Sequence, residues 1–185
     1  MRRLLVIGGG PIGIETALSF ARGGNYHVTV AERAPNFAAN VAAWGHVKLF
    51  SPWSLNMSSG GIAVLTASGV AIPERAAFPT GAQLRSQYLV HIWAWLEQSE
   101  ACSLLPATTV VGVTRGRKLK YDMSGRTAQP FRALILCDGV ESVSEFDAVI
   151  DCSGSYGNAN ALGVGGLAAI GERALQRCVF FRLII

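Results

Sequence analysis

A glycine-rich turn near the N-terminus constrains the fold of this chain more than any other feature. A short apolar run, Leu4 to Ile7, opens directly into the pattern Gly8-x-Gly10-x-x-Gly13, and helix-forming residues follow at once. In such a strand–turn–helix unit the first glycine permits a tight turn and the second lets a pyrophosphate approach the backbone. The third lets the helix pack against the strand, and the free N–H groups at the helix start attract an anion. The pattern therefore predicts a dinucleotide-binding site.

An acidic residue at the end of the next strand supports this interpretation. The alternating run from His27 to Ala31 ends at Glu32, 24 positions after Gly8. This is close to the roughly 20 positions that separate such a glycine motif from the carboxylate that binds the ribose. The phosphate loop of a nucleoside triphosphatase would instead continue with Lys and then Ser or Thr. Ile14 and Glu15 occupy those places, and a carboxylate there would repel phosphate.

The composition allows at most one ordinary domain, or one and a fragment, with a sizeable buried core. The chain has 185 residues, of which 50% are hydrophobic and 15% charged, and its net charge is +4. These values argue against disorder. The densest basic cluster, within 115–120, lies between two strand-like runs, so we interpret it as a solvated hairpin and expect no nucleic-acid partner.

The four cysteines indicate a reducing compartment, and we expect a cytoplasmic protein. Cys102, Cys137, Cys152 and Cys178 show neither a CxxC pair nor a zinc spacing, and three of them lie in apolar runs. We therefore expect no metal site. The glycine turn interrupts the first apolar run after four residues, which argues against a signal peptide. No apolar stretch reaches the length of a membrane span, so we expect no membrane partner.

Hydrophobic periodicity divides the rest of the chain into segments. The βαβ start covers 3–32, with a helix over about 11–23 between two strands. Residues 33–80 show no period, and a long irregular segment of this kind is usually functional. Apolar residues then recur at helical spacing over 83–98.

After Pro106 the period changes to two, which predicts antiparallel strands over 109–137. The expected strands are Thr109–Thr114, Leu119–Met123 and Phe131–Leu136. Asp138-Gly139 is a strong hairpin-turn signal, and a last strand is expected over 146–152. Together these segments predict an α/β fold: a Rossmann-type domain with a parallel sheet and an antiparallel strand insertion.

This order of segments resembles the FAD domain of flavin-containing monooxygenase-like and thioredoxin-reductase-like oxidoreductases. The resemblance covers about residues 3–175 and is carried by Gly8/Gly10/Gly13, Glu32, the insertion at 109–137 and Asp151-Cys152-Ser153-Gly154. More specific are the segments 44–53 (WGHVKLFSPW) and 156–160 (YGNAN), which are similar to a bacterial-type subgroup of FAD- and NAD(P)-dependent oxidoreductases.

The resemblance implies FAD as cofactor, with NAD(P)H reducing it in the intact family and oxygen or another acceptor receiving the electrons. It implies that the turn holds the pyrophosphate and Glu32 holds the ribose. Arg33 and the backbone near Val110 would flank the adenine, and Trp44 would lie toward the flavin unless it only packs the loop. The expected cofactor-binding residues are Gly8, Gly10, Pro11, Ile12, Gly13, Glu32, Arg33, Trp44, Val110, Ser153 and Gly154. No catalytic residue is assigned; His46 is a candidate by position alone.

Family members of this kind continue into a second glycine-motif domain for NAD(P)H, whereas this sequence stops at Ile185. We therefore expect a truncated chain that lacks the NAD(P)H domain, is incomplete at its C-terminus and is inactive alone, with an apolar tail over 178–185. Its small-molecule substrate is unknown, and a homodimer is kept open. The alternatives are a non-catalytic dinucleotide-binding or interaction fragment, and a small NAD-dependent Rossmann dehydrogenase, which the antiparallel block at 109–137 disfavours.

Overall fold

The computed structural model describes residues 1–119, 121–122, 124–157 and 160–175. Its first unit is β1 (Arg2–Ile7), α1 (Pro11–Gly23) and β2 (Tyr26–Ala31), as the sequence predicts. Proline suits the first position of α1, where its missing N–H is not needed. The helix ends at Gly24, whose φ of 71° is left-handed and is a common helix stop.

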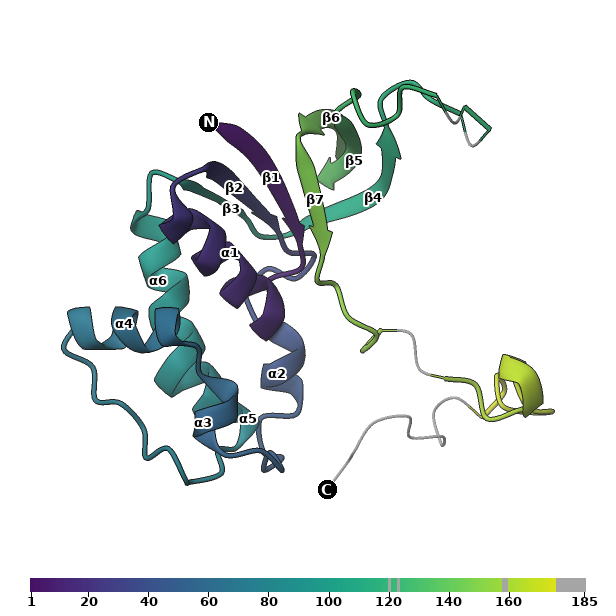
Figure 1. Ribbon diagram of the computed structural model, residues 1–185. Helices are drawn as coiled ribbons and strands as arrows, with labels where there is room; N and C mark the ends of the chain where they lie inside the picture. Colours follow the sequence, from purple (N-terminus) through teal and green to yellow (C-terminus); the bar gives the residue numbers. More distant parts are fainter. Residues whose placement is uncertain (120, 123, 158–159, 176–185) are drawn as a thin grey trace.

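The main sheet is parallel and has the strand order β3-β2-β1-β7 (Figure 1). Its outer strands are β3 (Cys102–Leu105) and β7 (Ala148–Asp151). The chain builds β1, β2 and β3 in one direction and then returns to the other side of β1. The strand order therefore reverses beside β1, and open α/β sheets bind ligands at that point.

A second, antiparallel sheet has the order β4-β5-β6, with strands β4 (Thr108–Arg115), β5 (Phe131–Cys137) and β6 (Val140–Phe146). The predicted hairpin turn is present, with φ of 50° at Asp138 and 77° at Gly139. The predicted strand at 119–123 is wrong: its described residues Leu119, Tyr121 and Asp122 are not in a strand. The predicted last strand over 146–152 is shorter, because Phe146 ends β6 and β7 begins at Ala148.

Three short helices lie in the segment for which the sequence shows no period. Within 33–80 lie α2 (Ala39–Ala43), α3 (Trp53–Asn56) and α4 (Ser59–Ala67), so the expectation that this segment is irregular throughout is wrong. The expected helix at 83–98 begins two residues earlier, as α5 (Gly81–Leu84), and continues through a π-helical turn η1 (Arg85–Leu89) into α6 (Val90–Gln98).

Two hydrophobic clusters fill the space on either side of the parallel sheet. Alternate residues of β1 face opposite ways: Leu4 and Val6 belong to the larger cluster, and Leu5 belongs to the smaller one. The larger cluster packs β1 and β2 against α1, α4 and α6, and the smaller one packs them against the antiparallel sheet (Figure 1). Burial on both faces explains the unbroken apolar run of β1.

The described residues form an α/β fold of Rossmann type with an antiparallel insertion, as expected from the sequence. No helix among them is both long and apolar enough to cross a membrane. The expected apolar tail over 178–185, Cys178 and part of the 156–160 motif lie outside the described residues. A short 3-10 turn, η2 (Val164–Gly166), is found in the last described segment.

Candidate dinucleotide-binding site

A cavity of about 860 Å³ lies at the carboxyl ends of β1, β2 and β7, where the strand order reverses. Ligand pockets commonly measure about 300–1,000 Å³. The walls come from the glycine turn, the end of β2, α2, the start of β4 and the segment after β7. Residues predicted from the sequence that line it are Gly8, Gly10, Pro11, Ile12, Glu32, Arg33, Trp44, Val110, Ser153 and Gly154.

The three glycines of the motif are required for different reasons. Gly8 has a φ of 103°, and a Cβ there would lie 2.8 Å from the carbonyl oxygen of Cys152. A Cβ on Gly13 would lie 1.9 Å from the carbonyl oxygen of Gly8, so this glycine lets α1 pack onto the turn. Gly10 has ordinary extended backbone angles, φ −78° and ψ −178°, and a Cβ there would meet no atom within 4 Å. The fold therefore needs glycine at the first and third positions but not at the second.

The N-terminus of α1 forms part of the cavity wall. Gly10 is its N-cap residue and supplies no side chain to cap the first-turn N–H groups, and the first turn contains no acidic residue. Gly10, Pro11 and Ile12 all line the cavity. Free N–H groups and the positive end of the helix dipole favour an anion at such a position.

The Glu32 carboxylate is held in place by backbone N–H groups. Its Oε2 accepts a hydrogen bond from the Gly9 N–H at 2.6 Å, and its Oε1 accepts one from the Ala34 N–H at 2.7 Å. An ionised carboxylate has about four acceptor positions, so each oxygen can still accept a further bond. Two hydroxyl groups of a ribose are donors of the kind that this half-buried carboxylate can bind.

Arg33, Val110 and Trp44 come to the same cavity from three different segments. Arg33 is exposed, and one of its guanidinium nitrogens would lie 3.6 Å from a Cβ on Gly157. Trp44 ends α2 and packs closely on Gly81, where a Cβ would lie 2.5 Å from the indole ring. Trp44 thus both packs its loop and lines the cavity.

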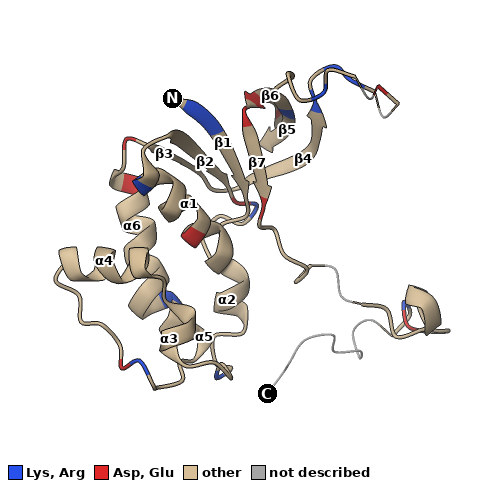
Figure 2. Cartoon of the chain, viewed as in Figure 1, with Lys and Arg blue, Asp and Glu red and all other residues tan. Residues whose placement is uncertain are grey.

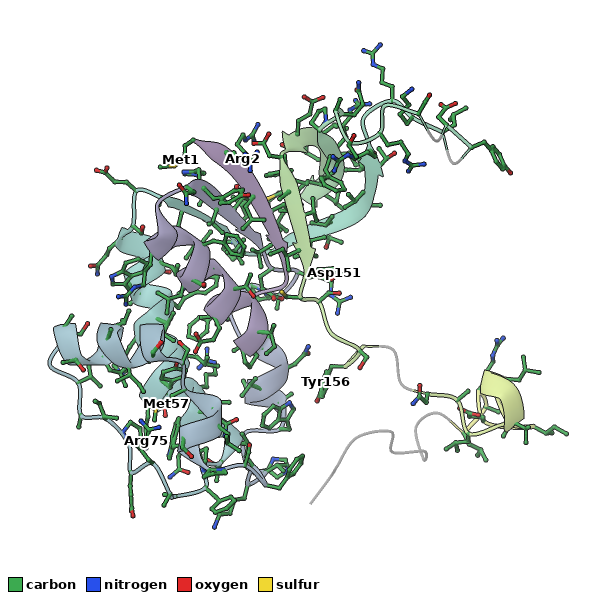
Figure 3. All side chains as sticks on the ribbon, in the orientation of Figure 1. Met1, Arg2, Met57, Arg75, Asp151 and Tyr156 are labelled. Atoms are coloured by element: carbon green, nitrogen blue, oxygen red, sulfur yellow. The ribbon has the colours of Figure 1, made fainter. Side chains whose placement is uncertain are left out.

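The last residue of β7 adds a carboxylate to the cavity wall. Asp151 Oδ1 accepts hydrogen bonds from the Ser153 hydroxyl at 2.6 Å and from the Ser153 N–H at 2.9 Å. These two donors stabilise the charged form and hold the pKa of Asp151 below its ordinary value. Figure 3 shows Asp151 at the end of β7 and Tyr156 farther along the segment that follows.

Two predicted residues lie outside this lining. Gly13 packs behind the turn rather than on the cavity surface, and His46 is exposed elsewhere. Asp151, Cys152 and Thr108 also line the cavity but were not predicted as site residues. The signal for Asp151 and Cys152 was that polar and small residues stand at the end of an apolar strand. A buried threonine at a strand start carries no comparable signal.

The comparisons with known proteins agree with the fold. The family model for pyridine nucleotide-disulphide oxidoreductases matches residues 3–44, and no curated protein matches the chain in sequence. The structure is similar to bacillithiol disulfide reductase Bdr from Staphylococcus aureus, with a TM-score of 0.57 at 18% identity, over 89% of this chain and 42% of that one. It is also similar to a cyclohexanone monooxygenase mutant from Rhodococcus sp. Phi1 bound to NADP+, with a TM-score of 0.58 at 13% identity.

The match to the cyclohexanone monooxygenase covers 83% of this chain and 26% of the monooxygenase. S-allyl-L-cysteine S-oxygenase from Allium sativum matches with a TM-score of 0.54 at 16% identity, over 83% of this chain and 36% of the oxygenase. The chain thus spans less than half the length of these solved structures. It shares the Rossmann-like fold of these oxidoreductase and monooxygenase structures over more than four-fifths of its own length.

Proposed function

We propose that this chain binds FAD and is part of an NAD(P)H-dependent flavoprotein oxidoreductase of monooxygenase type. The observation that carries the proposal is Gly10. This glycine lies in a cavity wall at a helix N-terminus, its backbone angles are ordinary, and a Cβ there would meet no atom within 4 Å. The fold does not need glycine at this position, where a side chain would project from the cavity wall. A ligand that must touch the backbone explains why glycine is found there.

The residues around the cavity fit the parts of FAD. The N-terminus of α1 would hold the pyrophosphate, and the fixed carboxylate of Glu32 would accept the ribose hydroxyls. Arg33 and the backbone at Val110 would flank the adenine. Trp44, Ser153 and Gly154 line the remaining wall and would face the rest of the cofactor. The redox chemistry of such enzymes is supplied by the flavin, which the protein binds and orients.

The proposal also includes a compartment, a substrate class and partners. We propose a cytoplasmic protein because the three described cysteines, Cys102, Cys137 and Cys152, are free. We propose a small-molecule substrate, and a homodimer as one assembly. The basic loop after β4 (Figure 2) does not point to nucleic acid. Arg115 at its start is already used internally, since it donates to the carbonyl oxygens of Arg126 and Thr127 and stacks on Phe131.

Equilibrium binding of FAD, compared with FMN and NAD+, tests the proposal. FMN keeps the flavin but lacks the adenosine half, and NAD+ keeps the adenosine half but lacks the flavin. We expect the purified chain to quench the fluorescence of FAD saturably and to bind FMN and NAD+ much more weakly. FMN binding as tight as that of FAD would contradict our placement of the adenosine. Tighter binding of NAD+ would support the NAD-dependent dehydrogenase instead.

A further inference from the structure

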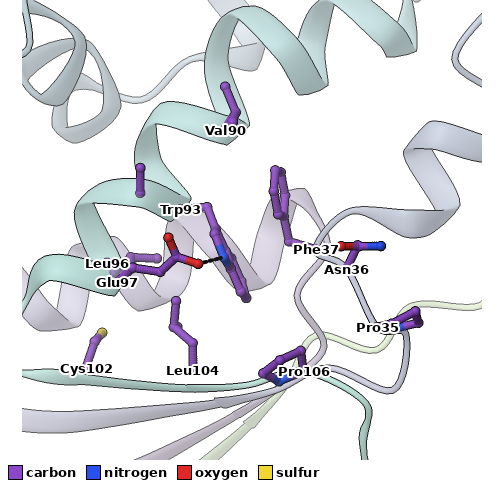
Figure 4. Close-up of a pocket in the computed structure, with 11 residues that line it drawn as sticks. Pro35, Asn36, Phe37, Val90, Trp93, Leu96, Glu97, Cys102, Leu104 and Pro106 are labelled. Atoms are coloured by element: carbon purple, nitrogen blue, oxygen red, sulfur yellow. Dashed lines mark hydrogen bonds between the residues drawn. The ribbon is translucent and has the colours of Figure 1, made fainter.

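A second cavity, of about 500 Å³, lies between α6, β3 and the residues just after β2 (Figure 4). It shares no lining residue with the dinucleotide cavity. Its volume is within the range of about 300–1,000 Å³ that is common for ligand pockets. The residues that line it are Pro35, Asn36, Phe37, Val90, Trp93, Ala94, Leu96, Glu97, Cys102, Leu104 and Pro106.

Two stacked aromatic rings form one wall of this cavity. The rings of Phe37 and Trp93 have centroids 5.2 Å apart and planes 19° from parallel. The indole Nε1–H of Trp93 donates a hydrogen bond to Oε1 of Glu97 at 2.8 Å (Figure 4), which fixes the orientation of the ring. Arg85 also stacks on Phe37, with its Cζ 4.6 Å from the ring centroid, but is not part of the cavity lining.

The segment that carries Phe37 is anchored at both ends. The Ala34 N–H donates to Glu32, and the Ala34 carbonyl oxygen accepts from the Ala107 N–H at 3.0 Å. The Ala38 N–H donates to the Gly9 carbonyl oxygen at 2.8 Å. The opposite walls belong to a helix and a strand. The cavity is therefore largely pre-formed, and a ligand would not have to order it.

Glu97 gives this cavity a single negative charge. It is the one charged residue in the lining, and the described part of the chain holds no salt bridge to it. Its carboxylate makes one hydrogen bond, to Trp93, which leaves acceptor positions free. The Cys102 thiol is neutral, because burial raises its pKa to about 11. A cavity with aromatic and aliphatic side chains in its walls and one carboxylate at its side complements an aromatic cation.

We propose that this cavity binds a small planar aromatic molecule that carries an ammonium or amidinium group. The ring would pack against Phe37, Trp93 and the aliphatic walls, and the cationic group would donate to Glu97. Offset stacking of aromatic rings and charge-assisted hydrogen bonding are the interactions involved. The inference does not depend on FAD binding, since the two cavities share no lining residue.

Titration of the 185-residue chain with 2-phenylethylamine tests this proposal. The four tryptophans give separate indole N–H resonances in a 1H–15N spectrum, and Trp93→Phe identifies the relevant one. We expect that resonance to shift saturably, with a Kd on the order of 1 mM, which is ordinary for so small a ligand. The anion 3-phenylpropionate has the same ring and a similar length, and we expect it to produce no saturable shift.

Three variants separate the contributions of charge and space. Glu97→Gln should weaken 2-phenylethylamine binding by about two- to fivefold, the range for exposed ion pairs, whereas Glu74→Gln, also exposed and outside the cavity, should leave it unchanged. Ala94→Phe fills the cavity without removing a wall and should abolish the shift. Equal binding of the cation and the anion, or an unchanged titration in Ala94→Phe, would overturn the proposal. If the Trp93 resonance shifts with protein concentration in the absence of amine, a second copy of the chain covers the cavity, and this too would overturn the proposal.

Discussion

The substitution Gly10→Val adds a branched side chain to the wall of the dinucleotide cavity. The backbone at Gly10 is extended and its Cβ position is free of neighbours, so the fold should tolerate the change. The side chain would occupy the approach to the N-terminus of α1, and we expect FAD retention to be abolished. Flavin fluorescence measures the binding, and thermal unfolding by circular dichroism measures the fold.

Gly13→Ala is the matched control, because its Cβ would lie 1.9 Å from the Gly8 carbonyl oxygen. This variant should lose stability as well as binding. Equal retention of FAD by the native chain and by Gly10→Val would mean that the pyrophosphate does not approach this turn.

The substitution Glu32→Ala removes the carboxylate at the end of β2. We expect FAD binding to weaken by about 1.5–3 kcal/mol, the range for hydrogen bonds to a charged group. Part of this loss comes from the turn, because the N–H groups of Gly9 and Ala34 lose their acceptor. Titration calorimetry on this variant and on Arg33→Ala measures the difference. Arg33 is exposed and should matter less; a larger loss at Arg33 would show that the ribose lies elsewhere.

Single residues were predictable where their role depends on local sequence. Gly8, Gly10 and Glu32 belong to one strand–turn–helix–strand unit, so spacing alone places them together. Asp151 reaches the cavity only because β7 pairs with β1 in register, Ile7 opposite Asp151. That pairing joins residues far apart in the chain, and no local pattern encodes it.

At the element scale, Tyr88 joins three helices through one hydroxyl group. The Tyr88 hydroxyl donates a hydrogen bond to Oε1 of Glu15 on α1. It also accepts a hydrogen bond of 2.8 Å from the N–H of Ser58 at the start of α4. Gly61 makes room for it, since a Cβ there would lie 1.9 Å from the hydroxyl oxygen. We expect Tyr88→Phe to lower the free energy of unfolding by about 1–3 kcal/mol, because the partly buried Ser58 N–H and Glu15 carboxylate lose their hydrogen-bond partner.

The contribution of Tyr88 should also depend on pH. Burial and the neighbouring Glu15 raise the pKa of Tyr88, so the folded state favours the protonated phenol. The stabilisation is then complete below the unfolded tyrosine pKa of about 10 and is lost as the pH rises above it. Chemical denaturation should show the gap between the native chain and Tyr88→Phe narrowing above that pH. Tyr26→Phe is the control, since its hydroxyl has one long contact, 3.5 Å from Arg2, and should give no such gap at any pH.

Elements were predictable where one face is clearly apolar. The helix α1 and strand β5 follow this rule, and β1 was predictable from its unbroken apolar run instead. In contrast, α4, with the sequence SGGIAVLTA, has two glycines and no polar face. The four residues of β3 are too short to show a period. β6 alternates little because its glutamates and serines face solvent. The predicted strand at 119–123 is wrong although its sequence alternates between polar and apolar residues. Leu119 and Tyr121 are 71% and 86% exposed, so the alternation corresponds to no buried face.

For the whole molecule, the described residues form one dinucleotide cavity, and FAD would occupy it. Hydride transfer needs the nicotinamide held against the flavin, and this positioning accounts for much of the rate. We therefore expect the 185-residue chain, saturated with FAD, to oxidise NADPH no faster than free FAD at the same concentration. Absorbance at the reduced-nicotinamide band measures the rate, and the Gly10→Val variant with added FAD controls for protein that does not bind it. Turnover above the rate of free flavin would show that this chain positions both nucleotides, and that it is an enzyme alone rather than a dinucleotide-binding part of one.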